Sequence, residues 1–312
     1  MTTFNKTNIA VIGAGRLGSI HARIYTELPQ ANLIGVCDID QSKSRTAAEA
    51  TNSRQFSDYR ELFPLVQAVS IAVPTIKHFE VAQEFIKRKI DVLVEKPFTT
   101  NLKQADSLIA LAEKNKVILQ VGHVERFNSA FSASQQLISH PRFIECHRLS
   151  PFPNRSLDVG VVLDLMIHDI DIILGLVHSP LKKAEGVGIN VLTQYEDIAN
   201  ARLTFENGCV ANLTVSRVSD EWMRKIRIFF KDTYISLDYR NEQAFVYRKN
   251  AIGITKESLP IEKEEPLKKE LSSFLDCVRE RKTPVVSGTV AREALAVALT
   301  IQKQIWKNTK LS

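Results

Sequence analysis

The residues best suited to chemistry begin with a lysine at the end of an apolar run. The segment "DVLVEKP" carries Glu95 and Lys96 immediately before Pro97, whose ring ends strand pairing. An ordinary lysine has a pKa of about 10.4 and keeps its proton at neutral pH. Burial or a neighbouring positive charge lowers that pKa and makes the amine a usable base or hydrogen-bond donor. Lys96 is therefore a candidate catalytic residue, and the alternative is that Glu95 and Lys96 are solvated charges at a strand end.

A second candidate group lies in "LDLMIHDID", where Asp164, His168 and Asp171 recur at helical spacing. Side chains at i, i+4 and i+7 share one face of a helix, so an imidazole could stand beside a carboxylate. Asp164 and His168 are the predicted catalytic residues of this segment. The three side chains could instead ligate zinc or manganese, or His168 could be a structural histidine. Because no second histidine follows at ligand spacing, we predict no metal.

A third pattern is the hexapeptide "GAGRLG", which follows a strand-like run and matches G-x-G-x-x-G. Gly13, Gly15 and Gly18 allow a tight turn, close approach of the backbone to a pyrophosphate, and close packing of helix on strand. The helix that begins there points free N–H groups at the phosphates. The next strand-like run ends in Asp38, where a carboxylate binds the adenosine ribose diol and repels a 2′-phosphate. The pattern predicts a dinucleotide site that favours NAD, while Lys43 leaves NADP open.

The predicted cofactor-binding residues come from three strand ends and the turns after them. His78 stands four residues after Pro74, where a helix is expected to begin. A partly exposed helix histidine is the alternative for His78. The full predicted set is Gly13, Gly15, Arg16, Leu17, Gly18, Asp38, Pro74, His78, Glu95 and Lys96.

The elements that must position these residues follow two patterns. Up to about residue 122, short apolar runs alternate with stretches whose apolar residues lie three and four apart. This alternation predicts an α/β domain with a parallel sheet covered on both faces, over 1–122. From 186 to 248 strand follows strand, and Asn207-Gly208 is a hairpin dipeptide. A second domain, over 123–312, is therefore expected to contain an antiparallel sheet with one packed face.

The motifs "GAGRLG", "PTIKH", "VEKP" and "GVVLDLMIHDIDI" occur in the order and approximate spacing of the Gfo/Idh/MocA oxidoreductase family. The chain resembles this family over essentially its whole length, although Met166 stands where the family commonly has glycine. The resemblance implies an N-terminal Rossmann domain with a doubly wound parallel sheet and a C-terminal α+β domain with an open, mostly antiparallel sheet. It also implies a cis Lys96–Pro97 bond and hydride transfer between a sugar-like alcohol and a nicotinamide cofactor, with either Lys96 or His168 as the base.

The segment "GHVERFN" is similar to one typical of the family's nucleotide-sugar 3-dehydrogenases. This similarity implies oxidation of the 3-hydroxyl of a UDP-N-acetylglucosamine-like substrate. Inositol, another polyol or glucose is the alternative substrate, and a non-catalytic NAD(P)-sensing regulator is the alternative from another class. The expected substrate-binding residues are Lys96, Arg126, Asn128, Asp164 and His168. For Arg126, whose planar fork suits phosphate or carboxylate, a structural salt bridge is equally compatible with the sequence.

Composition restricts the partners and the compartment. The net charge is +6, but Lys and Arg are dispersed, so an anionic small molecule is expected rather than nucleic acid. No apolar run reaches the roughly 18 residues of a membrane span, and the first residues show no signal-peptide pattern, which predicts a cytoplasmic protein. The four cysteines lie far apart and are expected to be reduced and buried. The uncovered sheet face predicts a homo-oligomer, either a dimer or a tetramer.

Overall fold

The computed structural model describes residues 6–152 and 159–309, which form two compact units. One unit contains Met1–Val124 and Leu267–Arg292, and the other contains Glu125–Pro266 and Glu293–Ser312. The segment Leu267–Arg292, expected in the domain over 123–312, here belongs to the first unit. The first five residues, which entered the expectation about a signal peptide, lie outside the described residues.

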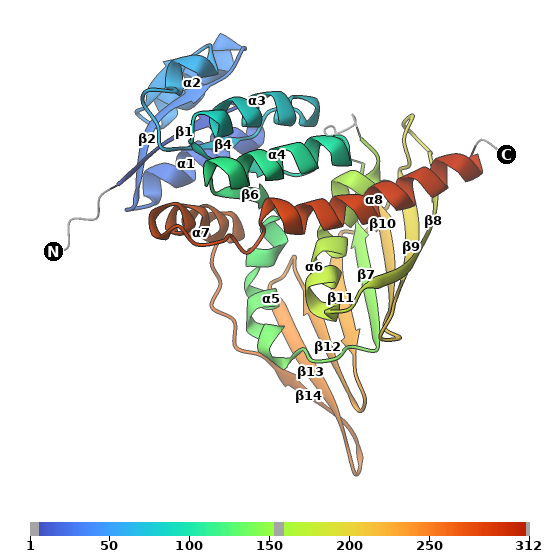
Figure 1. Cartoon of the computed structure of the whole chain (residues 1–312). Coiled ribbons are helices and arrows are strands. Elements are labelled where there is room, and N and C mark those ends of the chain that lie inside the picture. Colours follow the sequence, from blue (N-terminus) through green and yellow to red (C-terminus); the bar gives the residue numbers. More distant parts are fainter. Residues whose placement is uncertain (1–5, 153–158, 310–312) are drawn as a thin grey trace. The chain divides into compact units, whose positions relative to one another are not determined.

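The first unit is built on a six-stranded parallel sheet with the strand order β3-β2-β1-β4-β5-β6 (Figure 1). Its neighbouring strands β4 and β5 are buried throughout, as expected of a sheet covered on both faces. The strand order reverses between β1 and β4, and ligands of such sheets bind outside the carboxyl ends at this point. The predicted Rossmann half is thereby confirmed. The strands are β1 (Thr7–Ile12), β2 (Ala31–Cys37), β3 (Arg54–Phe56), β4 (Ala68–Ile71), β5 (Asp91–Glu95) and β6 (Leu119–Gly122).

Helices cover both faces of this sheet. In Figure 1, α3 and α4 lie side by side on one face, and α1 and α7 lie on the other. Helix α1 buries residues spaced three and four apart, among them His21, Ala22 and Tyr25, and shares a core with Phe274 of α7. Helix α4 begins at a side-chain cap, because Asn101 accepts a hydrogen bond from the N–H of Gln104. The helices are α1 (Arg16–Glu27), α2 (Gln41–Ala50), α3 (Thr75–Lys87), α4 (Leu102–Asn115) and α7 (Pro266–Glu280).

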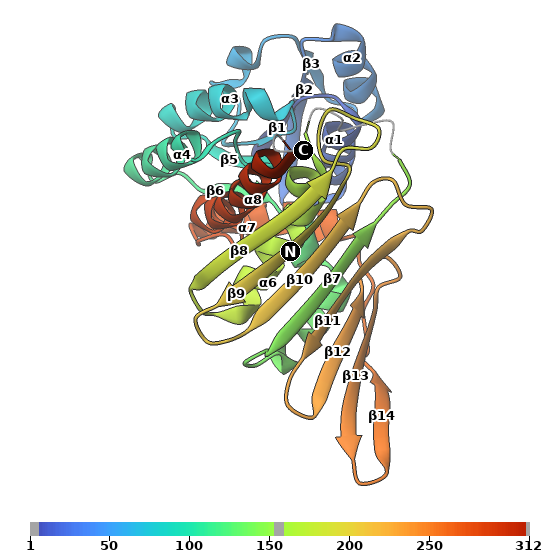
Figure 2. The same ribbon diagram turned by 90° about the vertical axis from the view of Figure 1, so that its right-hand side faces the viewer.

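The second unit contains an eight-stranded sheet with the order β14-β13-β12-β11-β7-β10-β9-β8 (Figure 2). Strands β7 and β10 pair in parallel. All other neighbouring strands of this sheet pair antiparallel. The mostly antiparallel sheet is therefore confirmed. Its strands are β7 (Phe143–Leu149), β8 (Leu181–Ile189), β9 (Ile198–Phe205), β10 (Val210–Ser216), β11 (Met223–Phe229), β12 (Thr233–Asp238), β13 (Gln243–Asn250) and β14 (Gly253–Ser258).

The local sequence explains two features of this sheet. Gly208 has a φ of +84° in the turn between β9 and β10, a conformation that favours glycine. Burial alternates along β9, so Ala199, Ala201 and Leu203 face the core while the residues between them face outward. The helices of the unit are α5 (Ser129–Ser134), α6 (Ile167–Val177) and most of α8 (Gly288–Thr309).

Helix α8 lies close against strand β8 because two glycines leave room for it. A Cβ atom on Gly186 would stand 2.6 Å from the side chain of Ile301, and one on Gly188 would stand 2.9 Å from that of Ile305. The side chain of Gln304 accepts a hydrogen bond from the N–H of Gly186 and donates one to the carbonyl of Ala184. Helix α8 is thus bonded to the backbone of β8.

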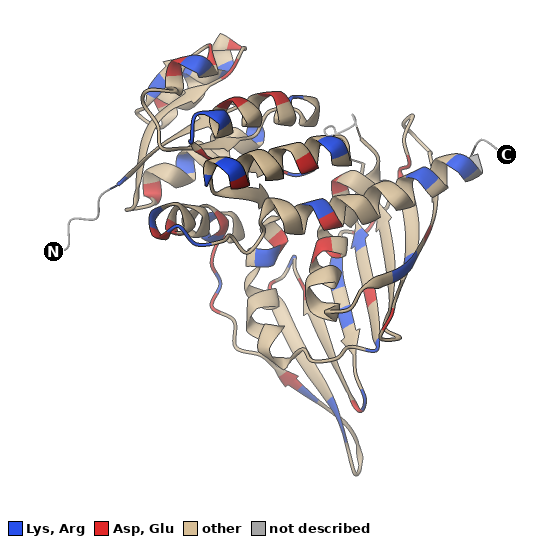
Figure 3. Ribbon diagram, in the orientation of Figure 1, with Lys and Arg blue, Asp and Glu red and all other residues tan. Residues whose placement is uncertain are grey.

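Charged side chains of both signs are spread over the chain, and its cysteines are free thiols. Lys and Arg are interspersed with Asp and Glu over the elements of both units (Figure 3). The four cysteines are free and buried, and burial raises the pKa of Cys37 to about 12 and that of Cys209 to about 11. None of the helices in the described part of the chain has the length and apolar character needed to cross a membrane.

Candidate functional site

The glycine turn after β1 has two packed glycines and one open one. Gly13 has a φ of +98°, and a Cβ atom there would stand 2.6 Å from the carbonyl oxygen of Ala72. A Cβ atom on Gly18 would stand 1.7 Å from the carbonyl oxygen of Gly13, so this glycine lets α1 pack on the turn. Gly15 has nothing within 4 Å of the corresponding position, and it is exposed together with Arg16 and Leu17. The turn and the helix start therefore present an open surface, without a side-chain cap, that suits phosphate groups.

The end of β2 is tied to this turn through Asp38. Its Oδ2 accepts a hydrogen bond of 2.6 Å from the N–H of Ala14, and its Oδ1 accepts one of 2.8 Å from the N–H of Asp40. A carboxylate can accept about four hydrogen bonds, so Asp38 keeps acceptor capacity for a ribose diol. Lys43 has its Nζ 3.1 Å from the carboxylate of Asp40 on the surface. The glycine turn and Asp38 together fit a dinucleotide.

The turn after β4 contains Pro74, which is exposed and caps the start of α3. His78 lies in the first turns of α3 and is buried, with a relative exposure of 1%. Its Nδ1 is 2.9 Å from the carbonyl oxygen of Pro97, and its Nε2 is 2.9 Å from that of Val73. Burial lowers the pKa of His78, against the effect of these two carbonyls. Both ring nitrogens therefore contact the main chain, which the sequence analysis did not foresee.

The end of β5 carries Glu95 and Lys96. Glu95 is buried above Gly122 of β6, because a Cβ atom on that glycine would stand 2.7 Å from Oε1 of Glu95. Oε2 of Glu95 accepts a hydrogen bond of 3.2 Å from the N–H of Lys96. Lys96 itself is half-buried, and the Lys96–Pro97 bond is cis, as the family resemblance implied.

Behind Glu95 lies a buried histidine that the sequence analysis missed. Nε2 of His21 stands 3.2 Å from Oε1 of Glu95, a close approach without the alignment of a hydrogen bond. Nδ1 of the same ring is 2.7 Å from Oγ of Ser70 on β4. His21 lies on the buried face of α1, and periodicity alone predicts only that a residue there belongs to the core.

In the second unit, Asp164 and His168 lie in helical segments with different winding. Val162–Met166 form one π-helical turn, and α6 begins only at Ile167. The three residues Asp164, His168 and Asp171 therefore do not all lie in one regular α-helix, because Asp164 belongs to the π turn that precedes α6. Asp164 is half-buried, whereas His168 and Asp171 are buried. Single π turns occur frequently at functional sites.

Arg126 and Asn128, both predicted to bind substrate, make hydrogen bonds within the second unit. Nε of Arg126 donates a 2.6 Å hydrogen bond to Oδ2 of Asp171, and Nη2 donates to Oδ1 and to the main-chain carbonyl of the same residue. Gly175 leaves room for this guanidinium. Asn128 is buried, accepts from the N–H of Ala130 and donates to the carbonyl of Tyr239. The contacts match the structural alternative that the sequence left open for Arg126.

Helix α6 is also held by a buried arginine that the sequence did not single out. Arg148 of β7 binds both carboxylate oxygens of Asp169 at 2.8 and 3.0 Å, and its Nη1 donates a 2.7 Å hydrogen bond to Glu125. Burial alone would lower the pKa of Arg148, but the carboxylates of Asp169 and Glu125 raise it well above its usual value. With Arg126 bound to Asp171, two arginines fix the helix that carries His168.

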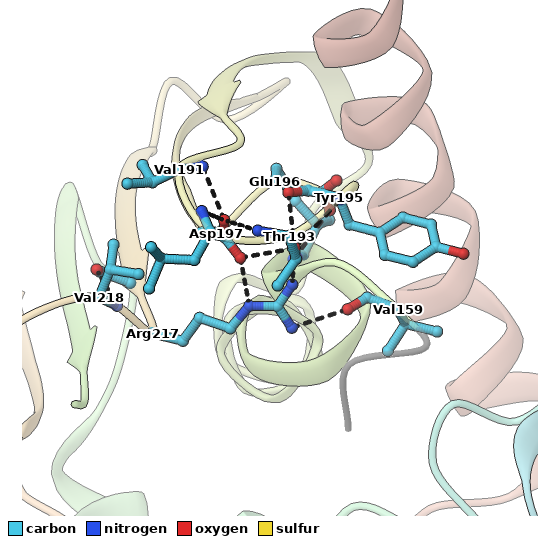
Figure 4. A network of polar contacts seen from close by, with 11 residues as sticks. Val159, Val191, Thr193, Tyr195, Glu196, Asp197, Arg217 and Val218 are labelled. Atoms are coloured by element: carbon cyan, nitrogen blue, oxygen red, sulfur yellow. Dashed lines mark hydrogen bonds and ion pairs between the residues drawn. The ribbon is translucent and has the colours of Figure 1, made fainter. Parts of the chain in front are cut away.

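A second buried arginine fixes the loop between β8 and β9 (Figure 4). Nε of Arg217 donates to Oδ1 of Asp197 at 2.8 Å, Nη1 to the carbonyl of Val159 at 2.9 Å, and Nη2 to Oγ1 of Thr193 at 2.8 Å. Oδ2 of Asp197 accepts three main-chain hydrogen bonds, from residues 191, 192 and 193. We call this buried ion pair, Asp197 with Arg217, the loop anchor.

Glu196 connects the loop anchor to the start of the π turn. Its carbonyl accepts a 3.0 Å hydrogen bond from the N–H of Val161, and its carboxylate accepts a longer one, of 3.4 Å, from the N–H of Val162. The indole of Trp306 donates to the same carboxylate at 3.3 Å. Gly160 leaves room for the carboxylate, because a Cβ atom there would stand 2.0 Å from it. The chain entering the segment with Asp164 is thus held at several points.

In the described residues, no group of three or more His, Cys, Asp or Glu side chains could hold a metal ion.

Comparison with known proteins agrees with this architecture. Residues 7–123 match the model of the "Oxidoreductase family, NAD-binding Rossmann fold", and residues 121–236 match the "GFO/IDH/MocA C-terminal domain". UDP-N-acetylglucosamine 3-dehydrogenase from Acidithiobacillus ferrooxidans is 36% identical over 94% of this chain and 95% of its own. A solved structure of that enzyme covers 96% of this chain and 97% of its own, with a TM-score of 0.93 and 35% identity. The scyllo-inositol 2-dehydrogenase (NAD(+)) of Bacillus subtilis is 27% identical over 95% of this chain and 93% of its own.

A Rossmann sheet with an open glycine turn and Asp38 at the end of its second strand defines a nicotinamide-dependent oxidoreductase. The chain belongs to the Gfo/Idh/MocA oxidoreductase family. The family resemblance is thereby confirmed, together with the expectation of a nicotinamide-dependent dehydrogenase that acts on CH–OH groups.

Proposed function

We propose that this protein oxidises the 3-hydroxyl of a UDP-N-acetylglucosamine-like nucleotide sugar to a ketone, with NAD as cofactor. The observation that carries the proposal is its 36% identity, over 94% of the chain, to a UDP-N-acetylglucosamine 3-dehydrogenase. The segment "GHVERFN", typical of nucleotide-sugar 3-dehydrogenases, supports the same substrate class. We also expect the division of labour that the sequence indicates, with 1–122 binding the cofactor and 123–312 the substrate and the partner subunits.

The residues of the first unit have roles in holding NAD. The open turn at Gly15 and the N–H groups that begin α1 suit the pyrophosphate, and Arg16 and Leu17 border it. Asp38 accepts hydrogen bonds from the ribose diol and repels a 2′-phosphate, so NAD is preferred over NADP. Bound NAD supplies the acceptor for the hydride of the carbinol carbon.

Two side chains handle the proton of the substrate. Lys96 donates a hydrogen bond to the reacting hydroxyl or accepts its proton, and His168 is the second group that can accept it. Asp164 orients the imidazole of His168 and binds the sugar. The substrate loses one hydride from carbon and one proton from oxygen, so a single base among these residues balances the reaction.

The test is NADH formation by the purified protein with NAD and UDP-N-acetylglucosamine. We expect Lys96→Met to reduce turnover by about 10²–10⁴-fold while NADH still binds. Lys103→Met, an exposed lysine on α4, is the matched control and should keep full activity. Unaltered turnover of the Lys96 variant would refute the assignment.

A polyol such as inositol is the second candidate substrate, because the 27% identical relative from Bacillus subtilis is a scyllo-inositol 2-dehydrogenase. Turnover of inositol or glucose, with none of the nucleotide sugar, would establish this alternative. Absence of NADH formation from all three alcohols, with NADH binding intact, would instead indicate a non-catalytic sensor of NAD(P).

We further propose that the protein is a cytoplasmic homo-oligomer, a dimer or tetramer, that binds no nucleic acid. The outward face of the second sheet carries exposed apolar side chains, with Val187 61%, Ile189 60% and Ile198 38% exposed. The substitution Ile189→Lys, which introduces a charge on this face, should reduce the mass measured by light scattering. Ile76→Lys, at a more exposed site of the first unit, should not. An unchanged mass for both variants would contradict the use of this face.

A further inference from the structure

We propose that His78 is a positioning residue that holds two loops of the first unit together, the turn after β4 and the turn after β5. One buried ring contacts a main-chain carbonyl of each loop, 2.9 Å from Val73 and 2.9 Å from Pro97. The inference rests on the proposed function in one respect, namely that Lys96 acts on the substrate. It replaces the expected direct contact of His78 with the cofactor.

Each loop belongs to one part of the proposed active site, the cofactor cradle or the reacting lysine. The turn after β4 packs against the glycine turn, because a Cβ atom on Gly13 would stand 2.6 Å from the carbonyl oxygen of Ala72 and 2.9 Å from the nitrogen of Val73. The turn after β5 contains Lys96, directly before the Pro97 whose carbonyl His78 contacts. The cofactor cradle and the reacting amine are therefore joined through a single side chain.

The chemistry of the contact requires a donor on the ring. Carbonyl oxygens only accept hydrogen bonds, so a ring nitrogen of His78 binds one only when it carries a proton. The neutral imidazole donates to one of the two carbonyls at a time, through whichever nitrogen is protonated, and the imidazolium donates to both. The contact between His78 and the carbonyl of Pro97 is buried, so that carbonyl cannot exchange it for bulk water at low cost; the contact with Val73 is partly buried. Replacing the ring with an apolar side chain would leave both carbonyls without that partner.

Two conservative substitutions separate the two contacts. An asparagine amide can place its nitrogen near the position of Nδ1 and so retain the contact with Pro97. A glutamine amide can place its nitrogen near the position of Nε2 and so retain the contact with Val73. We expect His78→Asn to keep turnover within about threefold while its Kd for NADH rises about tenfold, and His78→Gln to show the reverse.

The readouts are NADH affinity by fluorescence titration and the kcat and KM for NAD and UDP-N-acetylglucosamine. Val81→Ala, a buried change on the same helix, is the control for simple destabilisation of α3 and should not separate affinity from turnover. His78→Leu should lose both. Equal effects of the Asn and Gln variants on both readouts, or no effect of either, would overturn the proposal.

The measurement of the Kd for NADH does not depend on turnover of the sugar. If the wild-type protein turns over no sugar, the proposed function fails, but a weaker Kd for NADH in His78→Asn and not in His78→Gln still supports the positioning role. If both variants fail to fold, hydrogen exchange on the wild-type protein tests the proposal instead. NADH should then protect the segments 72–75 and 96–99 together, and protection of only one segment would overturn the proposal.

Discussion

Removal of the arginine of the loop anchor should destabilise the second unit strongly. Arg217 is 1% exposed and Asp197 is fully buried, and the guanidinium makes three hydrogen bonds of 2.8–2.9 Å. Arg217→Met keeps much of the volume but removes the cation and all three donors. Breaking a buried ion pair by removing one partner costs about 3–5 kcal/mol. The three main-chain N–H groups that still bind Asp197 offset part of this, so we expect about 4 kcal/mol.

The two tryptophans of the chain make this loss measurable in the second unit. Trp222 and Trp306 both belong to that unit, and Trp306 donates to Glu196, next to the loop anchor. Urea unfolding followed by tryptophan fluorescence therefore reports the stability of the unit that contains Arg217. With a slope of about 2 kcal/mol per molar urea, a loss of about 4 kcal/mol lowers the midpoint by about 2 M.

The pH dependence gives an independent check. Burial alone would raise the pKa of Asp197, but hydrogen bonds from Leu192, Thr193 and Arg217 hold it well below its usual value. A carboxyl with a lowered folded-state pKa contributes stability above its unfolded pKa of about 3.9, and this contribution is lost as the pH falls towards the folded value. Asp197→Asn should therefore flatten the acid limb of the stability curve. The reasoning is refuted if Arg217→Met unfolds within about 1 kcal/mol of the wild type at neutral pH.

Three further substitutions have defined outcomes. Gly122→Ala places a Cβ atom 2.7 Å from Oε1 of Glu95 and should lower turnover by about tenfold; an unchanged kcat would contradict the importance of this carboxylate. Asp38→Ser removes the charge that repels a 2′-phosphate, so the ratio of kcat/KM for NAD over NADP should fall by about tenfold or more, and a constant ratio would argue against the role of Asp38. Arg126→Met leaves Asp171 buried without its cation and should cost about 3 kcal/mol in urea unfolding; a loss of sugar affinity with unchanged stability would favour the substrate-binding alternative.

Local pattern was sufficient for the architecture and for the cofactor turn. Alternating apolar runs and helical stripes identified the parallel sheet, and consecutive alternating strands identified the antiparallel one. Gly13 and Asp38 could be placed because the turn and the strand end are read directly from a few adjacent residues. Such features depend on short sequence separations, where backbone sterics and periodicity decide the structure.

Features that depend on distant residues could not be predicted in the same way. Arg126 binds Asp171, 45 residues further on, and Arg217 binds Asp197 across a hairpin, so no local spacing marks either pair. The π turn before α6 could not be predicted, because counting residues at i and i+4 assumes a regular α-helix. The motif "PTIKH" placed His78 correctly at the start of a helix, but it did not indicate the two carbonyls that the ring contacts.

The division of the chain into units has a consequence for biosynthesis. The first unit needs α7, whose Leu271 and Phe274 lie in the same core as residues of β1 and α1, and the second needs Ile301 and Ile305 of α8 against β8. A ribosome adding about 5–20 residues per second delivers both helices after every strand. The first core stays incomplete until α7 has been synthesised and the second until α8 has been, so apolar residues of both sheets remain uncovered for seconds. Chaperone access and the speed of translation during synthesis of 267–309 should therefore affect the folding of this protein most.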